Sequence, residues 1–275
     1  MELWQALLLG LIEGLTEYLP VSSTGHLLLA QRALGLDEGR ASNAYAICIQ
    51  AGAVAAVFGL YFERVRQMLR GFLGRDGAGL RLTLNVGIAF VPAAVVGLVF
   101  DDWIDAHLLK LWPIVGAWLV GGVAILVVAY ARRGLLPPGG FALEQLAWRG
   151  ALAVGALQCI ALWPGTSRSL ATIVGGVLVG MNLAAALEFS FLLGLVTLLA
   201  ATAYKSMSDG ALMVHDFGWG AIVVGFVAAF AAAWVSVRWM VAYLNRRGLE
   251  VFGYWRVGLA LVTAVLIWRG VLATS

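Results

Sequence analysis

Charged side chains are scarce in this sequence. Asp, Glu, Lys and Arg make up 12% of the 275 residues, about half the fraction that is usual in soluble domains. Cysteine is scarcer still, because the chain has only Cys48 and Cys159, each within an apolar run. The first shortage excludes a water-soluble domain. The second leaves no basis for a disulfide framework or a zinc site.

Apolar residues and glycine fill the chain instead. The sequence is 62% hydrophobic, with 34 Gly and 11 Trp, and its mean hydropathy is +0.92. Membrane helices tolerate glycine at close contacts and carry tryptophan at the membrane interfaces. The composition excludes collagen, coiled coils and disordered chains, and predicts one all-α polytopic membrane domain over 1–275. The net charge of +3 is then explained by loops on one side of a bilayer rather than by nucleic-acid binding.

Six segments are apolar over the length of about 20 residues that a membrane crossing requires. They are 43–62, 82–100, 112–131, 183–203, 218–243 and 252–271. Two other apolar stretches, 3–34 and 146–180, are interrupted by LPVSSTGH at 19–26 and WPGTSRS at 163–169. Because proline removes a backbone donor, and irregular backbone at membrane depth must be buried or line a cavity, each stretch is predicted to be a re-entrant helical hairpin.

The two interrupted stretches resemble each other. Pro20, Ser22 and Ser23 recur as Pro, Thr and Ser at a uniform offset of 144 positions, and three spans follow each stretch. This predicts an internal duplication, with a first repeat over 1–131 and a second over 146–275. A hairpin does not cross the bilayer and three spans do, so the repeats are predicted to be inverted, with a ligand site near the midplane.

Basic residues predict which loops are cytoplasmic. The segment 63–81 and the later basic loops contain Arg64, Arg66, Arg70, Arg75, Arg81, Arg132, Arg133, Arg149, Arg246 and Arg247. The alternate loops contain Asp101, Asp102, Asp105, Lys110, Lys205, Asp209 and Asp216. This pattern predicts both termini on the outer side, the first hairpin entering from outside and the second from the cytoplasm.

Glu13 and Glu17 are candidate functional residues because charge at membrane depth costs about 2.5 to 3.5 kcal/mol per residue. Their spacing places both carboxylates on one face of a helix. Such a pair either raises one pKa or recruits a hard divalent cation such as Mg²⁺ or Ca²⁺. The alternative is an amphipathic helix whose acids lie among lipid headgroups.

The first loop, which reads Ser22, Ser23, Thr24, Gly25 and His26, is typical of an oxyanion cradle. Hydroxyls and helix-start amides bind phosphate oxygens, glycine permits close approach, and histidine transfers protons near neutral pH. The alternative is an ordinary helix-breaking loop with an interfacial histidine.

The second loop supplies a positive charge. It contains Gly165, Thr166, Ser167, Arg168 and Ser169, and the guanidinium of Arg168 has a planar fork of donors suited to phosphate. A salt bridge from Arg168 to one of the two glutamates is the structural alternative, and both roles are compatible. Convergence of these groups predicts phosphoryl chemistry. A lipid-phosphate transporter or flippase using the same site is the main rival from another class.

At these motifs the sequence resembles the undecaprenyl-pyrophosphate phosphatase family, also called the bacitracin-resistance protein family. The resemblance rests on EGLTEYLPVSSTGHL at 13–27, LWPGTSRS at 162–169 and EFSFLL at 188–193, with IQAG at 49–52 and RLTL at 81–84. It implies hydrolysis of undecaprenyl diphosphate to undecaprenyl phosphate, the lipid carrier of cell-wall synthesis, in the bacterial inner membrane. It also implies metal dependence, a homodimer, and bacitracin resistance on overproduction.

Carried over by position, the family's motifs place its acidic pair on Glu13 and Glu17, its hydroxyl and imidazole on Ser23 and His26, and its arginine motif on Ser167 and Arg168. Leu170 departs from the family pattern, where glycine usually stands, and so does Ala46, where an acid often stands. Glu188 matches a family segment and is equally well explained as an interfacial residue.

The resemblance leads to a mechanistic hypothesis. A diphosphate lies between the two loops, a divalent cation bridges it to Glu13 and Glu17, and Arg168 neutralises developing charge. The nucleophile is either Ser23 activated by His26, or a water activated by His26 or a glutamate. A phosphatidic-acid-type phosphatase is a second rival, but it requires a Lys-rich arginine motif and a second catalytic histidine. His107 and His215 lie in predicted outer loops instead.

Overall fold

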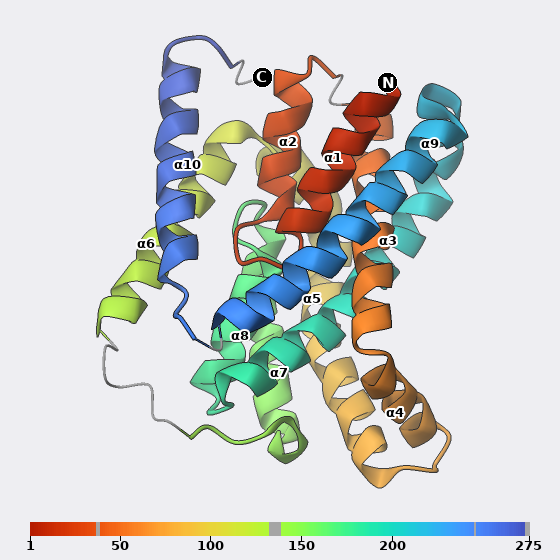
Figure 1. Cartoon of the computed structure of the whole chain (residues 1–275), viewed down its shortest axis with the longest axis vertical. Helices are drawn as coiled ribbons and strands as arrows, with labels where there is room; N and C mark the ends of the chain where they lie inside the picture. Colours follow the sequence, from red (N-terminus) through yellow and green to blue (C-terminus); the bar gives the residue numbers. More distant parts are fainter. Residues whose placement is uncertain (37–38, 132–138, 245, 273–275) are drawn as a thin grey trace.

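The structure, a computed structural model, describes residues 1–36, 39–131, 139–244 and 246–272. Figure 1 shows a bundle of helices joined by short connections. In chain order the elements are α1 (Leu3–Thr16), α2 (Ser23–Ala33), α3 (Arg40–Leu60), α4 (Phe62–Phe72), α5 (Gly77–His107), α6 (Leu111–Ala131), η1 (Leu143–Gln145), α7 (Trp148–Gln158), η2 (Cys159–Leu162), α8 (Arg168–Leu178), α9 (Leu183–Leu244) and α10 (Glu250–Trp268). The predicted all-helical class is confirmed.

The six predicted spans all fall on helices. They correspond to α3, α5, α6, α10 and the two arms of α9, which are separated by the non-helical backbone of Gly218 (φ 73°, ψ 158°). Among the described residues, α3, α5, α9 and α10 are long and apolar enough to cross a membrane by length and composition. The chain is therefore a multi-pass membrane protein.

Two predicted outer loops are instead helical. α5 continues through Asp101 and Asp105, beyond the predicted end at residue 100, and α9 continues through Lys205, beyond the predicted end at residue 203. The reason is charge pairing between the two extensions, because Lys205 Nζ lies 3.0 Å from Asp101 and 3.6 Å from Asp105. His107 and His215 are both exposed, as predicted.

The segment 63–81, predicted to be a loop, is also largely helical. It forms α4 and the first turn of α5, which pack side by side, and the Thr83 hydroxyl donates to the Met68 carbonyl between them. α4 is amphipathic, and Arg66 and Arg70 are exposed on it. Of the other arginines in the topology prediction, Arg132 and Arg133 lie outside the described residues.

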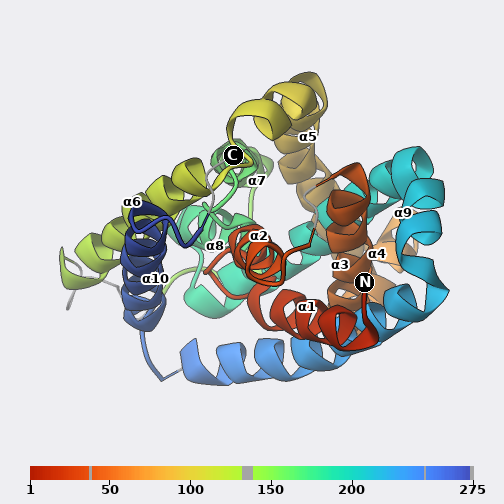
Figure 2. The ribbon, with the colours of Figure 1, turned by 90° about the horizontal axis from the view of Figure 1, so that it is seen from above.

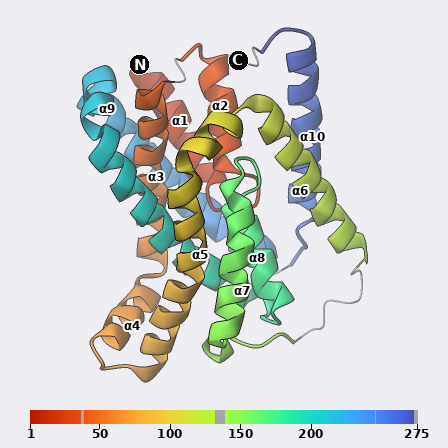
Figure 3. The ribbon, with the colours of Figure 1, turned by 180° about the vertical axis from the view of Figure 1, so that it is seen from behind.

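The two interrupted stretches form the predicted helical hairpins, α1–α2 and α7–η2–α8. In Figures 1 and 3 the open end of the first hairpin lies at the top, near Met1, and the open end of the second lies at the bottom. Their tips meet inside the molecule, where the Ser169 hydroxyl donates to the Leu19 carbonyl at 3.1 Å. Figure 2 shows α2 and α8 in the middle, with α6 and α10 on one side and α3 on the other.

Small residues bring α1 close to the second arm of α9. A β-carbon on Gly10 would overlap the carbonyl of Gly225, and one on Gly14 would overlap the carbonyl of Ala229. The Ser236 hydroxyl also donates to the Gly14 carbonyl at 2.9 Å. This close backbone packing fixes the helix that contains Glu13 and ends next to Glu17.

Candidate functional site

Glu17, which follows the last residue of α1, is the point where the two hairpins meet. Its Oε1 accepts a hydrogen bond from Arg168 Nη2, at the start of α8, at 3.0 Å. Its Oε2 accepts from the Ser23 hydroxyl at the start of α2 and from Gln50 Nε2 of α3, the latter at 3.3 Å. The Glu17 and Arg168 side chains are 6% and 11% exposed, so water screens the pair weakly. The acidic motif and the arginine motif are thus in direct contact.

Arg168 is held on several sides. Its Nη1 donates to the Ser190 carbonyl of α9 at 3.1 Å, and its guanidinium carbon lies 5.3 Å from the centroid of the Tyr18 ring. A β-carbon on Gly194 would overlap the guanidinium, so only glycine leaves room for the side chain to lie against α9. These contacts fix the orientation of the Arg168 guanidinium without any bound ligand.

Glu13 lies one helical turn before Glu17 and is 1% exposed. Its interacting neighbours are Glu17, Gln50 and Arg168, and its Oε1 is buried without a hydrogen-bond partner among the described residues. Two carboxylates thus share one guanidinium, which leaves a formal charge of −1 if both carboxyls are ionised. A proton or a bound cation is needed to balance a buried charge of this kind.

A divalent cation fits this donor set. Carboxylate oxygens suit Mg²⁺ and Ca²⁺, and the unpartnered Glu13 oxygen is available as a ligand. No group of three or more His, Cys, Asp or Glu residues that could hold a metal occurs in the part of the chain that the structure describes. Glu13 and Glu17 are therefore the residues that would hold such a cation.

His26 makes hydrogen bonds to groups other than Ser23 in the described part of the chain, whereas activation of Ser23 by His26 is one of the alternatives that the sequence leaves open. Its Nδ1 lies 2.7 Å from the Ser22 carbonyl, and its Nε2 accepts a hydrogen bond from Trp255 Nε1 at 3.0 Å. The ring also stacks on Trp255 and meets the edge of Trp118. Both ring nitrogens are therefore engaged. Because Ser23 instead donates to Glu17, the carboxylate is the nearer proton acceptor.

Ser22 and Ser167 share an uncommon backbone conformation. Each precedes the second helix of its hairpin, with φ of 72° and 76°, in a region that L residues seldom adopt and that costs about 1–3 kcal/mol. Ser22 therefore corresponds in backbone conformation to Ser167, whereas the offset of 144 positions pairs it with Thr166. The second loop is thus one residue longer than the first. The extra residue in the second loop is Gly165, whose φ is 98°.

The other predicted binding residues differ in how exposed their side chains are and in whether their hydroxyls already make hydrogen bonds. Thr24 is exposed and Thr166 half-buried, whereas the buried hydroxyl of Ser169 already bridges the two loops. Ser167 caps α8 by accepting from the Leu170 amide at 3.3 Å. Gly25 lies directly against the Trp118 ring. As positioned here, Ser167 and Ser169 stabilise the loops, and Thr24 is the freest of these hydroxyls.

Three consecutive carbonyls of the first loop are each bound by a different helix. Leu19 O accepts from Ser169 of α8, Pro20 O from Arg256 of α10 at 3.3 Å, and Val21 O from Trp118 of α6 at 3.1 Å; these donors are buried. The sequence interpretation missed Arg256, Trp118, Gln50 and Trp255. For Arg256 a signal existed, because it is an arginine inside the predicted span 252–271.

The two departures from the family pattern fit their surroundings. Leu170 is buried at the core contact that includes Val21 and Phe191, and Ala46 is half-buried against apolar side chains. Neither residue is a hydrogen-bond partner of Glu17 or Arg168 in the described part of the chain.

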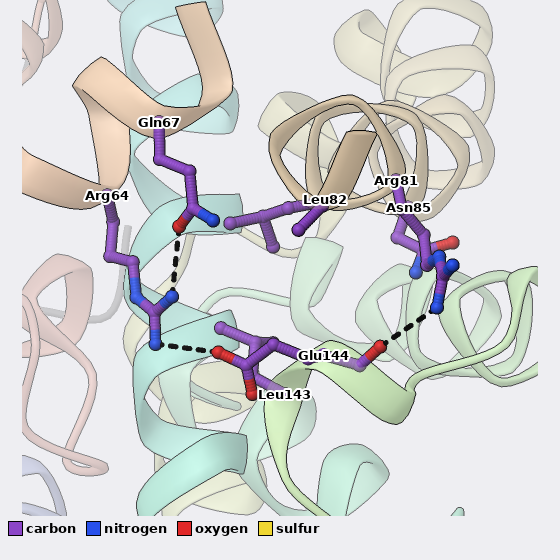
Figure 4. A pocket seen from close by; sticks show the side chains of 8 residues that line it. Arg64, Gln67, Arg81, Leu82, Asn85, Leu143 and Glu144 are labelled. Carbon is purple, nitrogen blue, oxygen red and sulfur yellow. Dashed lines mark hydrogen bonds and ion pairs between the residues drawn. The ribbon is translucent and has the colours of Figure 1, made fainter. Parts of the chain in front are cut away.

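Glu188 belongs to a separate polar cluster. It accepts from Arg64 Nε of α4 at 2.6 Å, and Arg64 also pairs with Glu144 at 3.0 Å. The hydrogen bond that Arg64 donates to Glu188 raises the pKa of Arg64. The pKa of Glu144 is lowered by the backbone amide of Glu144 and by Arg64. The adjoining cavity has a volume of about 120 Å³, and Figure 4 shows its lining side chains, which include Arg64, Glu144, Gln67 and Arg81. None of the predicted site residues lines this cavity.

Comparison with known proteins shows similarity along nearly the whole chain. The family model for the bacitracin resistance protein BacA matches residues 6–262. The undecaprenyl-diphosphatase of Sorangium cellulosum is 45% identical over 96% of this chain and 85% of its own length. Undecaprenyl-diphosphatase 2 of Rhodospirillum rubrum is 41% identical, and the undecaprenyl-diphosphatase of Cupriavidus metallidurans is 39% identical. Each of these alignments covers 98% of this chain and 97% of the relative.

The charge count at the site predicts unequal effects of two neutralising substitutions. Arg168→Gln leaves two carboxylates without a cation and is expected to destabilise the protein by about 3 kcal/mol. Glu17→Gln leaves one carboxylate with the guanidinium and should lower the thermal unfolding midpoint less. The double variant should recover part of the loss. Purified proteins in one detergent are compared, with exposed Arg269→Gln as the control. A midpoint for Arg168→Gln equal to that of the unsubstituted protein would contradict the count.

Proposed function

Because the chain belongs to the bacitracin resistance protein family, we propose that it is an integral-membrane undecaprenyl-diphosphate phosphatase. It hydrolyses undecaprenyl diphosphate to undecaprenyl phosphate and inorganic phosphate, which returns the lipid carrier to cell-wall synthesis and confers bacitracin resistance. The observation that carries this proposal is the buried contact of Glu17 with Arg168 and Ser23, beside a second carboxylate. A positioned nucleophile, its base and a fixed cation are the groups that phosphoryl transfer requires.

The diphosphate binds between the hairpin tips. Its oxygens compete with Glu17 for the guanidinium of Arg168, which Ser190 and Tyr18 hold in place throughout. The exposed Thr24 hydroxyl at the start of α2 is a further donor. The Arg168 guanidinium then stabilises the charge that develops on the transferring phosphoryl group, and it does so without having to reorient. Such preorganised electrostatic stabilisation is the main source of catalysis in reactions of this kind. The prenyl chain extends sideways into lipid.

Ser23 is the nucleophile in this proposal. Its Oγ attacks the terminal phosphorus, its proton passes to Glu17 Oε2, and the bond to the bridging oxygen breaks to release undecaprenyl phosphate. Water then hydrolyses the phosphoserine. The existing hydrogen bond from Ser23 to Glu17 supports this assignment over activation by His26, whose ring nitrogens are engaged elsewhere.

A divalent cation, Mg²⁺ or Ca²⁺, is part of the proposal. Glu13 and Glu17 are the residues that would hold it, and it would neutralise diphosphate oxygens when bound. The homodimer that the resemblance implies stays a prediction.

We also propose an inverted repeat, with hairpins 3–34 and 146–180 entering from the outer and cytoplasmic faces of the bacterial inner membrane. The opposed open ends in Figures 1 and 3 support it. The arginine-rich α4 region then faces the cytoplasm, both termini face outward, and the site opens to the outer side.

Phosphate release by pure protein tests the activity. In detergent with Mg²⁺ or Ca²⁺, the protein should release phosphate from prenyl diphosphates, and Arg168→Ala should lower turnover by a factor on the order of 10³. Arg269→Ala is the matched control. Detergent micelles have no second compartment, so absence of release with cation supplied would favour a transporter instead.

The same assay tests the cation. A chelator should stop release, and Glu13→Gln should raise the cation concentration that gives half the maximal rate, because one of two carboxylate ligands is lost. Glu63→Gln, at an exposed position in α4, should leave that concentration unchanged.

Rapid-quench labelling tests the nucleophile. With substrate radiolabelled in its terminal phosphate, label should appear on Ser23 within one turnover and be absent from Ser23→Ala. An unlabelled but fully active protein would show that water attacks directly.

Cysteine labelling tests the orientation. In a background without Cys48 and Cys159, Glu2→Cys should react with a membrane-impermeant maleimide in intact cells. Arg75→Cys, in the turn between α4 and α5, should react only after permeabilisation. The opposite pattern would overturn the topology.

A further inference from the structure

Arg256 of α10 is a fully buried cation whose hydrogen-bond partners are all backbone carbonyls. Its Nη1 donates to Pro20 O at 3.3 Å and to Thr166 O at 2.9 Å, and its Nη2 donates to Ala117 O at 2.9 Å and to Gly165 O at 2.8 Å. Its side chain is 0% exposed. One guanidinium therefore binds both hairpin loops and α6 at once.

No carboxylate pairs with Arg256 among the residues that the structure describes. An unpaired guanidinium at membrane depth is costly, and a protein retains such a group where it has a functional role. Charge balance does not explain it here, since Glu13 and Glu17 share Arg168 instead. The side chain instead satisfies buried carbonyls, three in the hairpin loops and that of Ala117 in α6, which have no bulk water to bind.

The surroundings are shaped to admit this side chain. A β-carbon on Gly121 of α6 would overlap Arg256 Nη2, and Gly122 lies against the Arg256 stem. Gly165 has a positive φ, and a β-carbon there would press on Ala117 and Ile114. Space at the α6–α10 contact is thus kept open for a planar, forked donor, a shape that lysine does not provide.

The bound carbonyls lie close in sequence to the groups of the proposed site. Pro20 stands three positions from both Glu17 and Ser23, and Thr166 two positions before Arg168. Separation of the loops by even 1 Å would move the nucleophile and base away from the cation, and misplacement on that scale can cost about 10²-fold in rate. Loop separation is therefore a quantity that the reaction depends on.

We propose that Arg256 is a positioning residue that sets the distance between the two hairpin tips, and with it the alignment of Glu17 and Ser23 with Arg168. The inference rests on the proposed function for its kinetic consequence, but the distance itself is independent of catalysis. The guanidinium acts on the backbone of the loops and does not contact the substrate.

A distance measurement tests the proposal directly. Spin labels at Leu15 of α1 and Ile160 of η2, both exposed, report the separation of the tips in a background without Cys48 and Cys159. Arg256→Met should broaden and lengthen the distance distribution, and Arg256→Lys should give an intermediate result. Arg269→Met, on the exposed end of the same helix, should not change it. This readout stands even if the protein hydrolyses no diphosphate.

Kinetics supply the second readout. Arg256→Met should lower kcat at least tenfold while KM changes by less than threefold, because alignment is lost and substrate contacts remain. Partial recovery of kcat is expected in Arg256→Lys. An unchanged distance distribution in folded Arg256→Met would overturn the proposal, and so would an unchanged kcat in active protein.

Gly121→Ala covers the case in which Arg256→Met does not fold. The added methyl displaces the guanidinium without removing its charge, so the distance distribution should shift in the same direction. Gly116→Ala, on the same helix but with open space around it, is the matched control. Equal distributions in the two alanine variants would count against positioning by Arg256.

Discussion

The buried ion pair between Glu17 and Arg168 is the interaction on which this structure depends. It joins residues 151 positions apart and connects the tips of two helical hairpins that enter the bundle from opposite ends. In a low-dielectric interior neither charge is stable alone, so each hairpin needs the other. The same pair leaves Glu13 with an oxygen that has no hydrogen-bond partner among the described residues, and this excess of negative charge is the basis for the proposed cation.

A second constraint comes from the backbone. The hairpin loops lie inside the bundle, where their carbonyls need partners from the protein itself, and side-chain donors from α6, α8 and α10 provide them. All three donors bind the first loop, and Arg256 of α10 binds the second loop as well. The stability of the loops and the alignment of the proposed site therefore depend on the same hydrogen bonds. Ser22 and Ser167, which have positive φ, each lie directly before the second helix of a hairpin.

The sequence was most informative at residues that are rare in apolar segments. The proline-containing loops indicated where the two hairpins turn. The carboxylates and the arginine near those loops indicated which motifs meet. It left open whether Ser23 or water is the nucleophile, because the sequence does not show that Ser23 and His26, both near the start of α2, make hydrogen bonds to different elements. It also misplaced helix ends, since Lys205 pairs with Asp101 across helices and extends both.

The order of the apolar segments, the two interrupted stretches and the acidic and arginine motifs follow from the sequence by itself, because hydropathy and the cost of buried charge act locally. The partners of each group were decided only by the tertiary structure. Arg256 lies in an apolar span 236 positions from Pro20, and no spacing rule relates them. Contacts between distant segments depend on how the helices pack, and that packing is a property of the whole chain.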